Sequence, residues 1–213
     1  MTIHTNSGLK LYMESAIGTA EPIDSISKAA PGVIASAGHP FVNGDNVLLE
    51  IQGMVELNGY LCKVVSVVAG VSFQVADVNG TTGIDTTLFS TFTSGTAKKV
   101  TLGTSITGVQ DFNFAGGEIK VQDTTTVNDT QDTQIVVGAT AQSADMTMQW
   151  DPASSAQQAM IAAFKTRANK GFKVLWPDGA FTMWYGTVGY TGAPGGGKQG
   201  VTTSPAKITM LGG

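Results

Sequence analysis

Short runs of apolar and β-branched residues recur along most of the chain, and turn-forming residues separate them. The runs lie at 9–15, 46–52, 60–68, 71–76, 117–123, 144–150, 171–176, 180–190 and 204–211. Asn58-Gly59 and Pro177-Asp178-Gly179 stand between successive runs and are typical of tight hairpin turns. The pattern therefore predicts a mostly β fold.

One segment has the spacing of a helix and not of a strand. Asp151 can serve as the N-cap, and Pro152 fits the first turn, where a backbone N–H would have no partner. Apolar residues then recur at every fourth position, at Ala156, Met160 and Phe164. This spacing predicts one α-helix that packs its apolar face on a sheet, with Gly171 as the stop signal.

The stretch from residue 30 to residue 98 has the punctuation of a separate unit. Ala29-Ala30-Pro31-Gly32 comes before it, and Thr93-Ser94-Gly95-Thr96 lies at its end. Because this stretch carries its own hairpin signals, we expect residues 30–98 to be an inserted small β-module. Residues 1–29 and 99–213 are then the two parts of one β-rich host domain.

The composition favours a surface that is covered by other copies of the chain. Apolar residues make up 42% of the 213 residues and charged residues only 13%, whereas ordinary soluble domains have about 25% charged residues. No apolar run approaches the roughly 20 residues that span a bilayer. The N-terminus also lacks the basic and apolar regions of a signal peptide. Self-assembly therefore explains the low charge better than a membrane does.

Charge and cysteine content exclude several kinds of site. The formal net charge is −4. This argues against a nucleic-acid-binding site, because such a site needs clustered Lys and Arg. Cys62 is the single cysteine, so an internal disulfide framework and a cysteine-based zinc cluster are excluded. Its neighbours Leu61 and Val64 favour a packed side chain over a nucleophile.

Two other features carry weaker signals for chemistry. Residues 192–198 fit the start of a phosphate-binding loop, but Gln199 stands where Ser or Thr is needed and a strand follows. We therefore expect a flexible hairpin loop there. His4 and His39 are the two histidines and do not make a credible metal site. The sequence predicts no catalytic residue, no cofactor and no metal.

The C-terminal half contains an ordered series of features. In order, these are Trp150 at a strand end, Asp151-Pro152, helical residues 157–161, and residues 175–179 and 181–186 in the next two strands. Upstream, residues 108–112 and 118–121 have the pattern of a hairpin. The series covers roughly residues 99–213. It resembles the tail tube (major tail) proteins of lambda-like siphophages.

This resemblance implies a structural protein and not an enzyme. It implies a β-sandwich or barrel with one flanking helix, in a subunit whose hexameric rings stack into a hollow tube. DNA passes through the tube during ejection without specific binding. The partners implied are other copies of the chain and the tail tip or initiator, tape-measure and tail terminator proteins. Assembly in the host cytoplasm, location in the virion tail and the absence of a cofactor are implied as well.

The inserted stretch has a resemblance of its own. His39-Pro40-Phe41, Asn43-Gly44-Asp45, Asn58-Gly59 and Phe73 follow one another with hairpin spacing. The series resembles a small β-barrel module of phage tail proteins. That module is named after the first catalytic cysteine half-domain of ubiquitin-activating enzymes. In phage proteins it is a decoration, and no enzymatic activity follows from its name.

Acidic residues are concentrated between residues 111 and 145. There are six against one basic residue, Lys120, and they are Asp111, Glu118, Asp123, Asp129, Asp132 and Asp145. A lumen through which DNA slides should repel phosphate. We expect Asp111, Glu118 and Asp145 to face such a lumen, with a solvated surface as the alternative explanation.

The most polar segment lies between two strand-like runs. Its members are Asp123, Thr124, Thr125, Thr126, Val127, Asn128, Asp129, Thr130, Gln131, Asp132 and Thr133. Because only Val127 is apolar, a lone subunit cannot bury enough surface here to offset the entropy of ordering. We expect this segment to be disordered in the monomer and to become ordered by docking on the neighbouring ring.

Other functions remain open on the sequence alone. The main alternative is a β-sandwich tail component that binds a receptor or glycan through exposed aromatic residues. A tube subunit of a contractile tail or of a secretion apparatus is a related structural alternative. A hydrolase with carboxylates scattered among the strands is a third, although no pair of carboxylates stands out.

Overall fold

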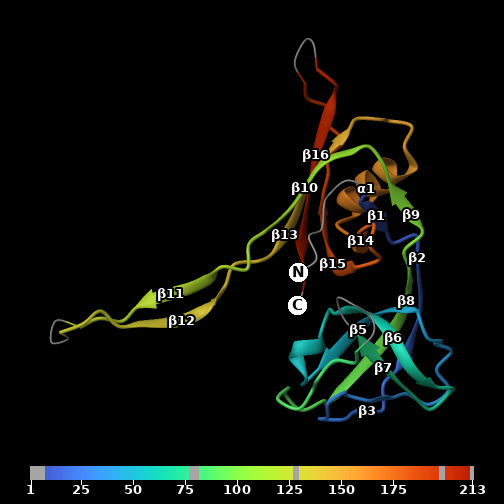
Figure 1. Cartoon of the computed structure of the whole chain (residues 1–213), viewed down its shortest axis with the longest axis vertical. Helices are drawn as coiled ribbons and strands as arrows, with labels where there is room; N and C mark the ends of the chain where they lie inside the picture. Colours follow the sequence, from blue (N-terminus) through green and yellow to red (C-terminus); the bar gives the residue numbers. More distant parts are fainter. Residues whose placement is uncertain (1–7, 77–81, 127–129, 197–199, 212–213) are drawn as a thin grey trace.

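Two antiparallel sheets of seven strands, a two-stranded sheet and an α-helix make up the fold (Figure 1). The computed structural model describes residues 8–76, 82–126, 130–196 and 200–211. Within these ranges α1 is the only α-helix, and it flanks the first sheet. The predicted mostly β fold with one flanking helix is confirmed.

The first sheet joins the N-terminal strand to the C-terminal half of the chain. In spatial order its strands are β10 (Val109–Ala115), β13 (Ser143–Gln149), β16 (Thr203–Met210), β15 (Phe181–Gly189), β14 (Asn169–Leu175), β1 (Lys10–Met13) and β9 (Thr104–Ile106). Alternation along the strands separates its two faces. In β13, Ala144, Met146 and Met148 are buried, whereas Asp145 and Thr147 on the other face are only half-buried.

Helix α1 (Ser155–Thr166) covers the apolar face of this sheet. Ala156, Met160 and Ala163 pack in one buried cluster with sheet residues that include Met146 and Ile208. The face predicted from Ala156 and Met160 is therefore buried. At Phe164 the prediction was wrong, because its side chain is 40% exposed. The buried face turns through Gln157 and Ala163, which leaves Phe164 at its margin.

Both predicted helix boundaries are corrected by local hydrogen bonds. The Asp151 carboxylate accepts from the N–H of Ala153 at 2.9 Å, which makes a turn before the helix, and Ser154 is the N-cap residue. The helix ends at Thr166, and the C-cap residue Arg167 has a left-handed φ of 54°. Gly171 lies in β14 and does not stop the helix.

The second sheet is formed by strands from the N-terminal half. In spatial order they are β2 (Ala16–Pro22), β8 (Ser94–Thr101), β5 (Asn46–Gln52), β6 (Leu61–Val68), β7 (Ser72–Ala76), β4 (Ile34–Ala35) and β3 (Ser25–Ile26), with a short 3-10 helix at Val55–Leu57. The sheet has a core of its own that includes Val47, Leu49 and Phe73. Because β2 pairs with β8, the chain enters and leaves this sheet on adjacent strands. The predicted module boundaries at residues 30 and 98 stay a prediction.

Apolar side chains join the two sheets, and an ion pair holds the segment between β1 and β2 to β14. Leu61 and Val100 of the second sheet pack with Met183 and Tyr185 of β15. Gly171 permits this approach, because a Cβ there would lie 3.1 Å from Leu61 and 3.2 Å from Val100. Beside it, the buried Glu14 carboxylate accepts from Lys170 Nζ at 2.9 Å and from the N–H of Gly171 at 3.1 Å.

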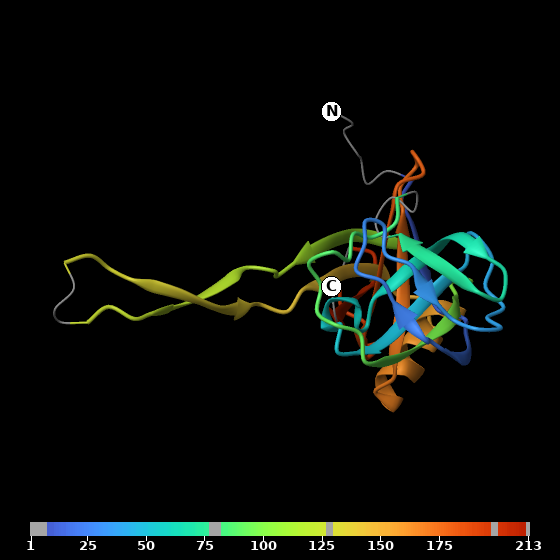
Figure 2. The ribbon, with the colours of Figure 1, turned by 90° about the horizontal axis from the view of Figure 1, so that it is seen from below.

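Residues 108–112 and 118–121 do not pair as the hairpin pattern predicted. β10 pairs with β13, whereas β11 (Ile119–Asp123) pairs with β12 (Gln134–Ala139). The chain runs from β10 into β11 and returns from β12 into β13, so the β11–β12 pair continues the β10–β13 pair. Together they make a long two-stranded ribbon that starts in the first sheet and projects away from both sheets (Figures 1 and 2). Local spacing could not reveal that the return strand lies beyond residue 130.

Substitutions on the helix distinguish its buried face from its margin. We expect Met160→Ala to lower the free energy of unfolding by about 2–5 kcal/mol, because it leaves a cavity in the core. Phe164→Ala should cost about 1 kcal/mol or less in the monomer, since the ring is already partly in water. Urea unfolding at concentrations that keep the protein monomeric measures both values. Equal losses would contradict the assigned face.

Candidate assembly surfaces

The outer part of the ribbon, formed by β11 and β12, exposes an unusual number of apolar side chains. Every residue of both strands is exposed. The apolar ones are Ile119, Val121, Ile135, Val136 and Val137, each more than half exposed. An isolated two-stranded ribbon is marginally stable in water, and clustered exposed apolar residues mark interaction surfaces. This ribbon therefore has the properties of an arm that binds a partner.

Two glycines shape the point where the ribbon leaves the first sheet. Gly116 and Gly117 have φ values of +88° and +80°, which side chains rarely adopt. A Cβ at Gly116 would also collide with the carbonyl oxygen of Ala141. Beyond this point the ladder continues, with the N–H of Thr140 donating to Glu118 O at 2.8 Å. The ribbon thus bends away from the sheet at a short interruption of the ladder, and the strand pairing resumes in β11 and β12.

The predicted inter-ring segment, residues 123–133, lies at the far end of the ribbon. Its described residues are all exposed, and Val127, Asn128 and Asp129 lie outside the described residues. The N–H of Thr124 donates to Thr133 O at 2.9 Å, so the ladder extends beyond Asp123. The hydroxyl of Thr125 donates to the Asp123 carboxylate at 2.6 Å and lowers the pKa of that group. The polar residues therefore bond mainly to one another.

Two of the three predicted lumen carboxylates lie on one face of the first sheet. Asp111 stands opposite Thr147 in the ladder, and Asp145 belongs to the adjacent strand on the same face. Both line one shallow depression. Lys207 lies beside them, with its Nζ 3.5 Å from Asp145 Oδ1. Glu118 is exposed on the ribbon, beyond the bend, and is not part of this group.

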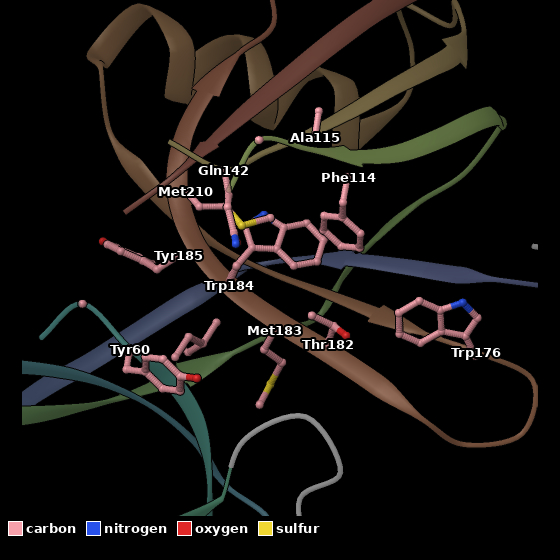
Figure 3. Close-up of a pocket in the computed structure, with 13 residues that line it drawn as sticks. Tyr60, Phe114, Ala115, Gln142, Trp176, Thr182, Met183, Trp184, Tyr185 and Met210 are labelled. Atoms are coloured by element: carbon pink, nitrogen blue, oxygen red, sulfur yellow. The ribbon is translucent and has the colours of Figure 1, made fainter. Parts of the chain in front are cut away.

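A pocket of about 570 Å³ opens between the two sheets at the root of the ribbon (Figure 3). Phe114 and Trp184 meet edge to face, with ring centroids 5.2 Å apart, on one side of it. Tyr60 of the second sheet and Met183 and Tyr185 of β15 line another part. No lining residue is charged. Nothing in the local sequence pattern indicated that these aromatic residues share a pocket.

A buried glutamine that sequence reasoning missed connects the helix to the first sheet. Gln157 Oε1 accepts from the Tyr190 hydroxyl at 2.8 Å and from the N–H of Asp151 at 3.1 Å. Its Nε2 donates to the carbonyl of Gln149 at 2.6 Å. The sequence signal for this contact was that Gln157, a polar residue, lies next to Ala156 on the packing side of the predicted helix. Buried polar groups with several partners fix one arrangement of the elements that they join.

The described residues offer little for chemistry. Cys62 is buried, and its thiol donates to the Val47 carbonyl at 3.7 Å. His39 is buried against the Phe41 and Phe73 rings. No cluster of three potential metal ligands occurs among the described residues. Residues 197–199 of the glycine-rich loop lie outside the described residues. Over the described ranges, no helix is long and apolar enough to cross a membrane.

Fold and surfaces together define a β-rich structural subunit with an extended arm. The family model of phage tail tube proteins matches residues 56–213, so the chain belongs to the phage tail tube protein family. The match covers the whole C-terminal half and begins inside the second sheet. No curated protein matches the chain. The protein is thus a structural component of a virion tail.

The Gln157 network gives a test with a neighbouring control. Gln157→Ala should lower the free energy of unfolding by about 2–4 kcal/mol, because the Tyr190 hydroxyl and the Gln149 carbonyl lose a buried partner. The exposed side chain of Gln158 donates to Pro152 O, so Gln158→Ala should cost less than about 0.5 kcal/mol. Denaturant unfolding of both variants measures the difference, and a small loss for Gln157→Ala would show that the network contributes little.

Proposed function

We propose that six copies of this tail tube protein form a ring, and that the rings stack into a hollow tube through which DNA passes during ejection. The observation that carries this proposal is the ribbon, whose exposed apolar strands extend away from both sheets. Such an arm has no partner within the described parts of its own chain beyond the β11–β12 pairing. A neighbouring ring supplies that partner in a stacked tube.

The charge distribution supports passage of DNA without binding. At −4 per copy, a ring of six copies carries −24. Asp111 and Asp145 lie on the face of the first sheet opposite the helix, which is the face that we assign to the lumen. Glu118 belongs to the ribbon and would add charge near the junction between rings. A negative lumen repels the phosphate backbone and keeps it mobile.

The remaining expectations are part of the same proposal. The tail is that of a lambda-like siphophage and is assembled in the host cytoplasm. The tail tip or initiator, the tape-measure protein and the tail terminator are the other partners. The module at residues 30–98 projects away from the lumen, because a bulky domain inside it would obstruct DNA. No activity or ligand is assigned to the module.

Electron microscopy of the purified protein tests the proposal. At high concentration we expect hexameric rings and hollow tubes in negative stain. Monodisperse monomers that bind a glycan array would instead support a receptor-binding tail component, and would overturn the proposal. Tubes that need a sheath protein to form would identify the tube of a contractile tail.

Hydrogen exchange tests the docking of the distal ribbon on the neighbouring ring. The N–H groups of Thr124 and Thr133 make single bonds in a fully exposed ladder, so they should exchange rapidly in the monomer and slowly in tubes. The buried ladder at Met146 should be protected in both states and serves as the control. Replacing residues 124–132 by Gly-Gly should leave a folded monomer that no longer polymerises. Equal exchange in monomer and tube would contradict this docking.

A further inference from the structure

Strand β15 is paired on both sides for only part of its length. It pairs with β14 from Phe181 to Thr187, but with β16 only from Gly186 to Gly189. Within the described chain, no strand pairs with the other edge of β15 from Phe181 to Trp184. This open edge lies in the pocket, which includes residues 182–185. Although β15 is an internal strand of the first sheet, its first residues therefore have an open edge on the β16 side among the described residues.

The backbone groups of this edge are directed into the pocket. The carbonyl of Tyr185 accepts from the N–H of Leu211 at 2.9 Å, so it faces the β16 side. In an antiparallel strand the direction of these groups repeats every second residue. The N–H and C=O of Met183 and Phe181 therefore face the same side, beyond the end of β16. The carbonyl of Ala180 instead accepts from Trp176 on the β14 side, which agrees with this alternation.

The walls of the pocket suit a strand that is apolar on both of its faces. Trp184, Phe114 and Met210 lie along one side of the edge, and Met183, Tyr185 and Tyr60 along the other (Figure 3). Strands that are buried on both faces have continuous apolar runs and not alternating ones. An occupant with three consecutive apolar residues and no charge therefore fits this uncharged pocket.

Strand β12 is the segment of the described chain that meets these requirements. It has β11 on one side and, among the described residues, no strand on the other, so its second edge is open. Its sequence, Gln134–Ala139, contains no charge and has Ile135, Val136 and Val137 in succession, each more than half exposed. β11 alternates apolar residues with Lys120 and Gln122, and it ends at Asp123. Composition therefore selects β12 and not β11.

We propose that β12 of one copy adds as a strand to the open edge of β15 in another copy. The added strand makes a continuous sheet in which β11 and β12 of the first copy extend β15 and β14 of the second. It brings backbone partners to Phe181 and Met183 and buries the exposed run 135–137 in the pocket. This is strand addition to an exposed sheet edge between identical chains. It rests on the proposal that copies assemble into a tube, and it identifies the surface that receives the ribbon.

Two charge substitutions on the ribbon distinguish this strand pairing from nonspecific hydrophobic association. Val136 and Ile119 are both 67% exposed, but only Val136 lies on the strand proposed to pair. Val136→Lys should abolish tubes while leaving the monomer folded, because it places a charge in an uncharged pocket. Ile119→Lys should still form tubes. Tubes from Val136→Lys, or loss of tubes from Ile119→Lys alone, would overturn the proposal.

Crosslinking between two populations identifies the contact directly. Protein with Thr182→Cys is mixed with protein that carries Ile135→Cys, Val136→Cys or Val137→Cys, assembled into tubes and oxidised. At least one mixture should give disulfide-linked dimers, since neighbouring strands bring opposite Cβ atoms within about 5.5 Å. The mixture with Ile119→Cys is the control and should give none. Cys62 is buried and common to all samples.

Hydrogen exchange on wild-type tubes separates failure of this contact from failure of tube formation. The N–H groups of Phe181 and Met183 should become protected on assembly, whereas Thr182 and Trp184, bonded to β14, are protected in both states. Tubes in which no 135–137 mixture crosslinks overturn the strand addition and leave the tube function intact. Absence of tubes from the wild-type protein overturns the proposed function itself.

Discussion

Open strand edges are the constraint on which this molecule depends, because backbone N–H and C=O groups at an edge need partners. Many soluble β proteins protect such edges with charges or short strands. Here β12 presents an uncharged apolar run beside an edge that no described strand pairs with. β15 has a stretch inside an apolar pocket that pairs on only one side among the described residues. A monomer that keeps both features is suited to joining other copies. The low charge content, 13% of residues, is consistent with surfaces that assembly covers.

An arm of this kind is useful only on a rigid body, and buried polar contacts supply that rigidity. Gln157 fixes the helix against β13 and the end of β15 through three hydrogen bonds. Glu14 fixes the point where the chain crosses from the first sheet to the second, through Lys170 and the N–H of Gly171. These contacts stabilise the body of the subunit, whereas every residue of β11 and β12 is exposed.

Sequence patterns identified elements whose signals are local. The run 46–52 is strand β5, because β-branched and aliphatic residues there lie in a buried ladder. The strand at 16–22 was not recognised, since its residues are mainly small or polar and it ends in Pro22. The start of the helix was misplaced because the Asp151 side chain makes a turn of its own. The face of the helix was partly misjudged, because a four-residue repeat does not reveal that Gln157 is buried.

Pairing partners were beyond the reach of local patterns. Nothing near residue 115 shows that β10 pairs with β13 while β11 pairs with β12, because strand pairing is decided by packing over long separations. The open edge of β15 depends on where β16 ceases to pair, at Gly186, and no residue of β15 signals this. Of the predicted carboxylates, Asp111 and Asp145 share a face only because their strands are neighbours, whereas Glu118 follows the bend at Gly116 and Gly117.

Residues at the edge of the second sheet line part of the pocket beside β15. Leu61 and Val100 pack on Met183 and Tyr185, and Tyr60 lines the pocket beside them. An added strand at the β15 edge would therefore contact both sheets. The ion pair between Glu14 and Lys170 lies where the chain passes from the first sheet to the second. A displacement of the second sheet would open one wall of the pocket without altering the β15 edge itself. In the proposed strand addition, the position of the second sheet would therefore affect how well the pocket accepts the added strand.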